Sequence, residues 1–400
     1  MSELSADFLR YLCPTSDEPL GLVIDRAEGC YLRTRDGRRI LDFISGIAVC
    51  SVGHGRPEVL RAIQAQAERH LHVMVYGEVV QEAQVALAKR LAAIAPGDLS
   101  TTFFCNSGAE AIEGALKLCR KATGRTRIVA FNGGYHGDTL GALSIAGEPR
   151  YQKPFEPLLP DVHLLPFDAR DALVAIDERV AGVVVEPIQG EAGVRVPEPG
   201  FLPALRARCR QVGALLVLDE AQTGIGRTGR WFACEHWGVV PDCLVLAKAL
   251  GGGLPLGAFI GPPALMRTLA VDPPFAHVTT FGGHPVSCAA GLAALEVIEG
   301  QRLLENAAAM GQQLRGVLSQ LSGVREVRGM GLLVGVELDE PSVVPTVLRL
   351  ALERGLLLGG FLNAPGVIRV APPLVVSRDL CDRAVEILAE CLERARAHQS

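Results

Sequence analysis

Long apolar runs, clusters of basic residues and paired cysteines are all missing from this 400-residue sequence. No stretch approaches the ~18 consecutive apolar residues that a membrane-spanning helix needs, so a membrane protein is not expected. The first seven residues lack a basic segment followed by an apolar one, which favours a cytoplasmic location. The basic residues are scattered and the pI is near 6.0, so we expect no nucleic-acid partner.

Cysteine occurs eleven times, but never as a Cys-x-x-Cys pair and in apolar surroundings such as Phe104-Cys105. That pattern is typical of reduced thiols in a core, so neither a metal site nor a disulfide framework is predicted. With 49% hydrophobic residues and a net charge of −5, the chain has enough apolar material for more than one domain.

Lysine is scarce, because the chain has five lysines and 34 arginines. One of the five, Lys248, lies in the apolar segment 243–253, where a buried ammonium is costly. Arginine keeps its proton in proteins, whereas a desolvated lysine can become a neutral amine that condenses with an aldehyde. The alternative is a lysine at a strand end, with its stem buried and its charged head in water.

Between about residues 100 and 262, short apolar runs alternate with helical stretches. This is the pattern of βα units around a mainly parallel sheet. The spacing of apolar residues also predicts helices over 109–122 and 289–299. The predicted strands of this part are 101–105, 128–132, 180–186, 215–219, 243–247 and 257–261.

The two ends of the chain have a different pattern, with short strands near the amino end and an α+β alternation after about residue 301. Asp36-Gly37 is predicted as a hairpin turn. The predicted elements are strands 22–25, 30–34 and 39–43, helix 303–321, strands 324–329 and 332–338, helix 344–354, strand 366–371 and helix 378–397. We expect an α/β protein with a large domain, 45–300, and a smaller α+β domain formed by 1–44 and 301–400.

Asp219 ends one predicted strand and Lys248 follows another. Because ligands collect at the carboxyl ends of strands in open α/β sheets, the two side chains are expected to meet in one crevice. The pair suits pyridoxal 5'-phosphate, whose aldehyde bonds to a lysine and whose ring nitrogen needs an acidic partner to stay protonated. A helix cap or turn former is the alternative for Asp219.

Further motifs leave strand ends in the same part of the chain. One of them joins a strand to a helix, where the Ser107 hydroxyl and the backbone of Gly108 could hold a phosphate. An ordinary serine N-cap is the alternative. Tyr135 could stack on a planar cofactor or keep a hydrated hydroxyl in its loop. Glu186 and Glu191 supply two more carboxylates.

Ordered motifs run along nearly the whole chain. They are Gly29-Cys30-Tyr31-Leu32, Gly53-His54, Asn106-Ser107-Gly108-Ala109-Glu110-Ala111, Val185-Glu186-Pro187-Ile188-Gln189-Gly190-Glu191, Leu218-Asp219-Glu220-Ala221-Gln222-Thr223-Gly224, Ala247-Lys248, Thr279-Thr280-Phe281-Gly282-Gly283 and Ile368-Arg369-Val370-Ala371-Pro372-Pro373. This set resembles the class III, fold-type I, pyridoxal-phosphate-dependent aminotransferases, which include the ornithine, acetylornithine and 4-aminobutyrate enzymes. The resemblance implies their fold: a large, mainly parallel-sheet domain and a smaller α+β domain.

The resemblance also implies a role for each matched residue at the cofactor. Lys248 would bind the cofactor covalently and then carry the proton, while Asp219 would bind the pyridine nitrogen. Gln222 would approach the phenolic oxygen, Tyr135 would stack on the ring, and Glu186 would lie at the cofactor. A homodimer with shared active sites is expected, because one phosphate ligand comes from the other subunit. The residues expected at the phosphate are Ser107, Gly108 and Ala109 of one subunit and Thr280 of the partner subunit.

On the substrate side, the resemblance implies that Arg369 binds the carboxylate of a 2-oxo acid. Glu191 would pair with Arg369 when the donor has no carboxylate there. Thr279 is expected at the substrate as well. The ornithine and acetylornithine enzymes have an arginine where this chain has Asp138, and the stretch 134–139 looks like that of diaminopelargonate aminotransferases. Asp138 either attracts the far ammonium of a diamine or hydrogen-bonds its own loop.

The predicted function is transfer of an amino group from a primary amine or ω-amino acid, through the cofactor, to a 2-oxo acid such as 2-oxoglutarate or pyruvate. Two alternatives stay open. One is an aminomutase, racemase, epimerase or decarboxylating enzyme on the same fold, and the other is a non-catalytic binding protein. The Glu191 and Arg369 pair favours transfer between unlike substrates, and the complete set Lys248, Asp219, Gln222 and Thr280 argues against a binding protein.

Overall fold

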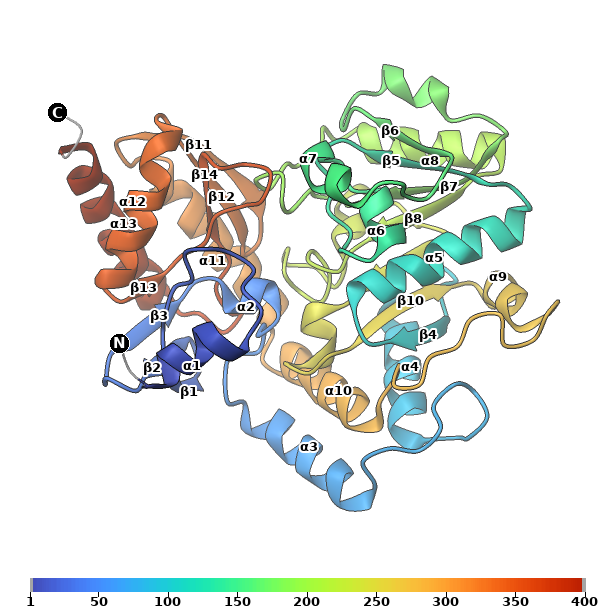
Figure 1. The fold of residues 1–400 in the computed structure, drawn as a ribbon, viewed down its shortest axis with the longest axis horizontal. Helices are drawn as coiled ribbons and strands as arrows, with labels where there is room; N and C mark the ends of the chain where they lie inside the picture. The colour runs from blue at the N-terminus through green and yellow to red at the C-terminus, as the bar shows by residue number, and fades with distance from the viewer. Residues whose placement is uncertain (1–2, 398–400) are drawn as a thin grey trace.

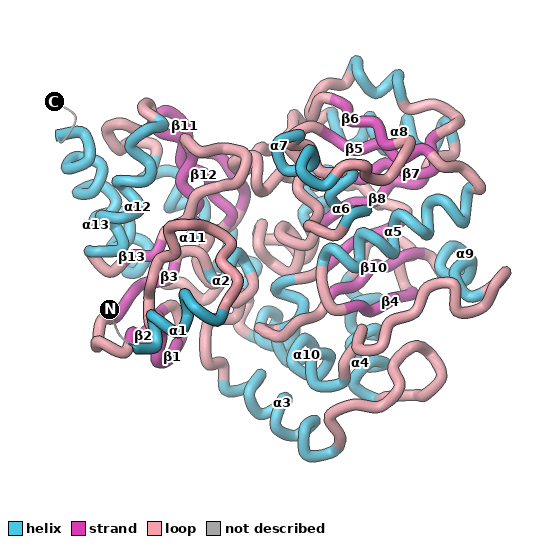
Figure 2. Tube along the Cα trace, viewed as in Figure 1, coloured by secondary structure: helices cyan, strands magenta, loops and turns pink. Residues whose placement is uncertain are grey.

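The computed structural model describes residues 3–397, which form two lobes that lie side by side (Figure 1). A seven-stranded sheet lies in one lobe, and a four-stranded and a three-stranded sheet lie in the other. Figure 2 shows the strands in two separate groups with helices around each group. None of the described helices is both long and apolar enough to cross a membrane.

The seven-stranded sheet is parallel apart from one strand. β10 (Gly257–Gly261) pairs antiparallel with its two neighbours, β4 (Thr101–Cys105) and β9 (Cys243–Leu246). The order is β4-β10-β9-β8-β7-β5-β6, and the carboxyl ends of all strands except β10 lie along one edge. The remaining strands are β5 (Arg127–Phe131), β6 (Val162–Leu165), β7 (Val180–Val185) and β8 (Leu215–Asp219). The predicted mainly parallel sheet is confirmed, whereas the half-exposed edge strand β6 was not predicted.

β7 is buried throughout because helices cover both faces of the sheet. Its side chains alternate between two apolar clusters. Val183 packs in the cluster that contains α8 (Phe201–Val212), and Val184 packs in the cluster that contains α5 (Gly108–Thr123). On the first face, α10 (Pro285–Gly300) packs against α3 (Pro57–Arg69) and α4 (Glu82–Ile94).

Both ends of the chain contribute to the other lobe, where the blue and red segments of Figure 1 meet. In its four-stranded sheet, β13 (Leu356–Leu357) pairs parallel with β3 (Arg39–Asp42). β2 (Tyr31–Thr34) pairs antiparallel with β1 (Ile24–Glu28) and with β3, so the hairpin at Asp36-Gly37 is confirmed. The first strand extends to Glu28 rather than ending at residue 25, because Glu28 pairs with Tyr31 across a turn at Gly29, whose φ is +56°.

The three-stranded sheet has the order β11-β12-β14 and is antiparallel. Its strands and the helices of this lobe are β11 (Val324–Met330), β12 (Leu333–Leu338), β14 (Val367–Val370), α11 (Leu303–Leu318), α12 (Val344–Glu353) and α13 (Arg378–Ala397). The shorter helices of the chain are α1 (Glu3–Tyr11), α2 (Ser45–Ala48), α6 (Leu140–Ser144), α7 (Pro149–Gln152) and α9 (Pro263–Met266). The boundaries 44/45 and 300/301 between the two domains stay a prediction.

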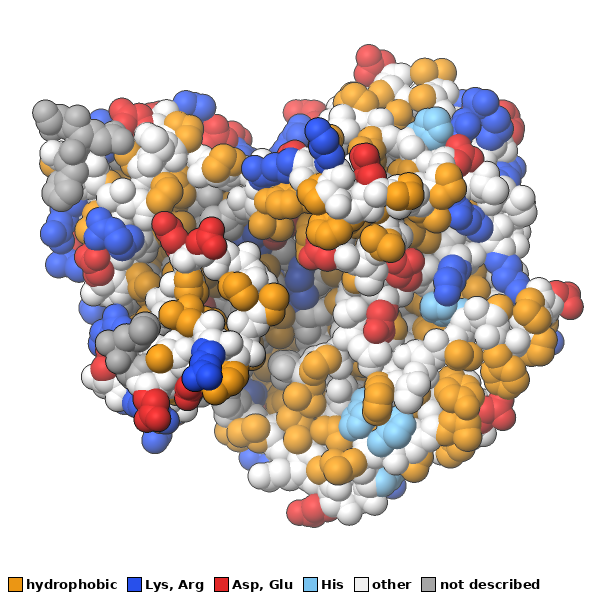
Figure 3. All heavy atoms as spheres, in the orientation of Figure 1, with side chains coloured by type: hydrophobic (Ala, Val, Ile, Leu, Met, Phe, Trp, Pro, Cys, Tyr) orange, Lys and Arg blue, Asp and Glu red, His pale blue; other side chains and the backbone are white. Residues whose placement is uncertain are grey.

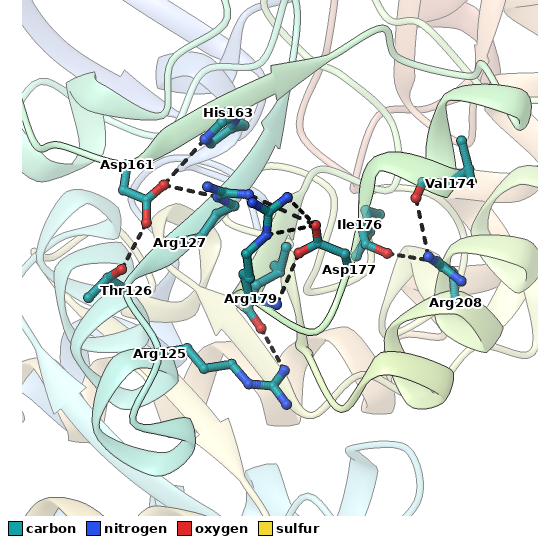
Figure 4. A network of polar contacts seen from close by, with 11 residues as sticks. Arg125, Thr126, Arg127, Asp161, His163, Val174, Ile176, Asp177, Arg179 and Arg208 are labelled. Carbon is teal, nitrogen blue, oxygen red and sulfur yellow. Dashed lines mark hydrogen bonds and ion pairs between the residues drawn. The ribbon is translucent and has the colours of Figure 1, made fainter.

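A network of charged side chains joins the amino ends of β5, β6 and β7 (Figure 4). Asp161 accepts hydrogen bonds from Arg127 Nε at 2.9 Å and from the Thr126 hydroxyl at 2.8 Å. The bond to Arg127 is the main reason why the pKa of Asp161 falls to about 2. Arg125 donates to the Val180 carbonyl at 2.9 Å. These groups stabilise the edge of the sheet opposite to the one that carries Asp219 and Lys248.

The contact of α5 with β10 depends on a glycine. A Cβ at Gly114 would lie 2.2 Å from the ring of Phe259. A helical Gly→Ala change normally stabilises by about 1 kcal/mol. We expect Gly114→Ala to destabilise by ~1–2 kcal/mol instead, because overpacking a core outweighs the helix propensity.

Gly316→Ala in α11 is the matched control, since a Cβ there would meet nothing within 4 Å. We expect it to raise the midpoint of thermal unfolding slightly, while Gly114→Ala lowers it. Equal upward shifts for both variants would contradict the packing of α5 on β10.

Candidate active site

Lys248 follows β9 and is the first residue of a 3-10 turn, Lys248–Gly251. Its φ of +49° lies in the left-handed region, which non-glycine residues rarely adopt and which surrounding structure must enforce. Burial lowers the pKa of its ammonium, and this effect outweighs the neighbouring carboxylates. The charged groups that act on it are Asp219, Glu191, Glu186 and Arg369. An amine with a lowered pKa is more readily available as a nucleophile and a base.

Asp219 is 5% exposed and pairs with His136, a residue that the sequence did not single out. The distance from His136 Nδ1 to Asp219 Oδ2 is 2.8 Å, and Asp219 Oδ1 accepts from the Ala221 amide at 3.0 Å. Burial alone would lower the pKa of His136, but the hydrogen bond to Asp219 and the charges of Asp219 and Glu186 raise it overall. The bond to His136 therefore fixes the orientation of the Asp219 carboxylate. In the sequence, the feature that could have pointed to His136 was its place next to Tyr135, in the loop predicted to contact the cofactor.

Glu186 is buried and joins two loops of the site. It accepts hydrogen bonds from the Tyr135 amide at 3.1 Å and from the Gly190 amide at 2.9 Å. Burial raises the pKa of Glu186 to about 7, although the charge of His136 opposes the shift. Its contacts are those of a residue that holds the loop after β5 against the loop after β7.

The start of α5 lies against the segments that carry Lys248 and Asp219. A Cβ at Gly108 would lie 3.4 Å from Ala247 and 3.5 Å from Ala221. The loop after β5 reaches the same place, since a Cβ at Gly137 would lie 2.5 Å from Ala109. Ser107 is the N-cap of α5, where its hydroxyl oxygen accepts from the Glu110 amide at 3.2 Å. The start of this helix, where a phosphate is expected, therefore lies beside the segments that carry Lys248 and Asp219.

Gln222 has a buried Oε1 atom without a hydrogen-bond partner among the described residues. The atom points toward Gly190, because a Cβ at that glycine would lie 2.6 Å from it. A buried polar atom left unpaired costs ~1–3 kcal/mol, so a ligand that hydrogen-bonds there is favoured. The residues around Lys248 fit pyridoxal phosphate: an amine, a buried carboxylate for the ring nitrogen, an amide for a ring substituent and a helix start for the phosphate.

Arg369 and Glu191 form a buried ion pair, as their predicted partnership requires. Arg369 Nη2 lies 2.5 Å from Glu191 Oε1, and the two residues are 3% and 6% exposed. Glu191 Oε2 also accepts from the Leu362 amide at 3.1 Å, and the Arg369 guanidinium lies 4.2 Å from the centre of the Phe361 ring. Arg369 comes from β14 and Glu191 from the loop after β7, so the pair joins the two lobes.

The structure places the other predicted substrate residues in loops. Asp138 Oδ2 accepts from the Tyr135 hydroxyl at 2.8 Å, which is the local bond foreseen as one of its two roles. Burial, followed by this bond, raises the pKa of Tyr135. Thr279 Oγ1 accepts from the Gly282 amide at 3.1 Å and from Asn106 Nδ2 at 3.4 Å. Thr280 is exposed next to it.

Comparison with known proteins gives a consistent result. Residues 12–392 match the family model described as aminotransferase class-III. An acetylornithine aminotransferase from Streptomyces coelicolor is 46% identical over 378 residues, covering 94% of this chain and 92% of its own. A putrescine aminotransferase from Pectobacterium atrosepticum is 41% identical over 375 residues, covering 90% and 79%. The ornithine aminotransferase of Toxoplasma gondii, solved with pyridoxal phosphate at partial occupancy, aligns with a TM-score of 0.91 at 32% identity, covering 99% and 94%.

The fold, the site and these comparisons define a pyridoxal-phosphate-dependent transaminase. The chain belongs to the class III aminotransferase family. The predicted family, fold, cofactor and class of enzyme are confirmed.

The pairing of His136 with Asp219 predicts a pH dependence of stability. Because the native pKa of His136 lies above its ordinary value of 6.5, the pair stabilises fully below that value and less as pH rises through the native pKa. We expect the difference in unfolding free energy between the native chain and His136→Gln to shrink as pH rises above about 6.5. Urea unfolding at a series of pH values measures it.

His163→Gln is the matched control, because His163 lies 3.3 Å from Asp161 at the surface and its side chain is 50% exposed. Solvent screens such a pair, so the control should show little pH dependence. A His136→Gln difference that stays constant across the range would contradict the charged pair.

Proposed function

We propose that this enzyme moves an amino group from a primary amine or ω-amino acid to a 2-oxo acid, 2-oxoglutarate or pyruvate, in two half-reactions of a ping-pong cycle. The observation that carries the proposal is the buried ion pair of Glu191 and Arg369 beside Lys248. An arginine that can exchange an internal carboxylate for one on a substrate allows one pocket to accept both an anionic acceptor and a donor without that charge.

The bound cofactor supplies an electron sink for the carbanion that forms at the substrate carbon. Asp219 would hold a proton on the ring nitrogen, and the bond to His136 keeps the Asp219 carboxylate oriented. Lys248, with its lowered pKa, would take the proton from the carbon that bears the donor's amine and deliver it to the C4′ carbon of the cofactor. In the second half-reaction it would carry a proton the opposite way, from C4′ to the carbon of the 2-oxo acid that receives the amine. The residues proposed to bind the cofactor are Ser107, Gly108, Ala109, Tyr135, Glu186, Asp219, Gln222 and Lys248, with Thr280 of the partner subunit.

Arg369 and Glu191 are proposed to select the substrates, with Thr279 and Asp138 at the same site. When the donor has no carboxylate at this position, Glu191 neutralises Arg369. When the 2-oxo acid binds, Arg369 releases Glu191 and binds the substrate carboxylate. The exchange can occur because either carboxylate satisfies a guanidinium that is almost fully buried, and Glu191 keeps its bond from the Leu362 amide.

The relatives support a donor whose reacting amine is at the end of its carbon chain, since acetylornithine and putrescine both have such an amine. They differ at the far end, where one carries a carboxylate and the other an ammonium. Asp138 gives this chain a negative charge in the loop next to Tyr135. An isomerase on the same fold is the alternative, but it has no need for an exchangeable ion pair.

A homodimer is proposed as the working form. Apolar side chains are exposed along two neighbouring loops, where His72 packs on Phe281 at 5.0 Å between ring centres and Tyr76 on Phe275 at 6.3 Å. Thr280 lies in one of these loops, and Figure 3 shows apolar side chains, in orange, gathered on this part of the surface, at the lower right of the view. The exposed apolar residues are Leu71, Val73, Met74, Tyr76, Val79, Val80, Phe275, Val278 and Phe281.

We also propose a cytoplasmic location, because all eleven cysteines are free thiols, as in a reducing compartment.

Label transfer tests the proposed reaction. With ¹⁵N-labelled cadaverine or 4-aminobutyrate and unlabelled 2-oxoglutarate or pyruvate, we expect the label in the amino acid formed from the 2-oxo acid. Mass spectrometry of the products measures it. Label that stays in an isomer of the donor, with none in the added 2-oxo acid, would establish the isomerase alternative.

The donor preference should respond to residue 138. Asp138→Arg introduces a cation for a donor carboxylate, so we expect the kcat/KM ratio of acetylornithine to cadaverine to rise about tenfold. Asp138→Asn removes the negative charge without adding a cation and retains an acceptor for the Tyr135 hydroxyl, so it should raise the ratio by less than Asp138→Arg does. A native enzyme that already prefers ornithine-type donors strongly would contradict the proposal that the carboxylate of Asp138 disfavours donors that carry a carboxylate.

A further inference from the structure

Glu191 lies in a tight turn between two lobes. Gln189 and Arg195 form an antiparallel bridge at its base. Within the turn, the amides of Gly193 and Val194 both donate to the Gly190 carbonyl, at 3.0 and 3.1 Å. The position of the Glu191 carboxylate therefore depends on where this turn is held.

The turn rests on the three-stranded sheet of the smaller lobe. In the register of that sheet, Arg328 of β11 lies opposite Gly335 of β12, which lies opposite Arg369 of β14. Side chains directly opposite each other across antiparallel strands share a face. A Cβ at Gly335 would lie 2.8 Å from the Gly193 carbonyl oxygen, so the missing side chain leaves room for the turn between two arginines.

Each arginine holds one part of the turn. Arg369 binds the Glu191 carboxylate, and Arg328 Nε donates to the Gly193 carbonyl at 2.7 Å. Arg328 is fixed in turn by Glu337 at 2.6 Å and Glu326 at 2.8 Å, both bonded to its Nη1 atom. Its side chain is 17% exposed, so water competes little for these bonds.

We propose that Arg328 is a positioning residue for the Glu191–Arg369 pair and thereby for the choice between the two substrates. The inference rests on the proposed function, because it assigns a role within the same exchange. Arg328 touches no reacting atom. It fixes the backbone two residues after Glu191, so that the carboxylate returns to Arg369 each time a donor without a carboxylate binds.

Loss of this anchor affects the two half-reactions differently. A mobile turn weakens the internal ion pair, which leaves Arg369 charged and unpaired when a diamine binds and thus raises the free energy of that complex. The complex with the 2-oxo acid does not contain the internal ion pair, so the loss of the anchor changes its free energy little. A purely structural defect would instead slow both half-reactions by a similar factor.

Arg328→Met tests the inference, because methionine keeps an apolar stem and removes the guanidinium. We expect kcat/KM for cadaverine to fall about tenfold relative to kcat/KM for 2-oxoglutarate, measured in separate half-reactions of the holoenzyme. Arg328→Lys should give an intermediate ratio, since one ammonium cannot serve Gly193 and Glu337 in the same geometry. Arg325→Met is the matched control: Arg325 also pairs with Glu337, at 3.1 Å, but its other bond goes to the Asp339 carbonyl.

Hydrogen exchange tests the anchor without turnover. We expect faster amide exchange in the peptide covering 189–195 for Arg328→Met, and native rates there for Arg325→Met. Unchanged exchange in this peptide, or an equal loss in both half-reactions, would overturn the inference. A native enzyme that transfers no amine to any 2-oxo acid would instead refute the proposed function, while the exchange comparison would still test the anchor. If Arg328→Met does not fold, the same comparison is made with Arg328→Lys.

Discussion

The site depends on one constraint, which is that several charged groups are buried together at the carboxyl edge of a mainly parallel sheet. Each of the three carboxyl groups that act on Lys248 has a partner of its own: Asp219 has His136, Glu191 has Arg369, and Glu186 has two backbone amides. Lys248 is therefore not required as their counter-ion, and burial lowers the pKa of its ammonium despite the three nearby carboxyl groups. This distribution of partners allows an amine to act as a base where an ammonium would be expected.

The second condition for function is the placement of the two lobes. Glu191 and Arg369 come from different lobes, and the fully buried Arg227, in the loop after β8, bonds to carbonyls of the smaller lobe. Arg227 donates to the carbonyls of Leu332 and Pro372, at 3.1 and 2.5 Å, and burial lowers its pKa to about 10. These bonds hold the two lobes together at their junction, because separating the lobes would leave the buried guanidinium of Arg227 and the carbonyls that it binds without partners. The proposed substrate site thus depends on the same contacts that join the lobes.

Much of this could be predicted from the sequence, because strands such as β7 and helices such as α5 have strong apolar patterns and the residues of the site follow strand ends. The edge strand β6 was missed because its half-exposed side chains give no such pattern. The direction of β10 was not predictable from its apolar run, which is the same in a parallel or an antiparallel strand. His136 and Arg328 were missed because their roles depend on partners 83 and 135 residues away, at Asp219 and Gly193.

The most direct test of the central claim is to locate the lysine that binds the cofactor. The holoenzyme would be treated with borohydride, which fixes a lysine-bound pyridoxal phosphate, and its peptides would then be mapped by mass spectrometry. The account predicts the label on Lys248 and on none of the other four lysines. A label on another lysine, or no label at all, would contradict it.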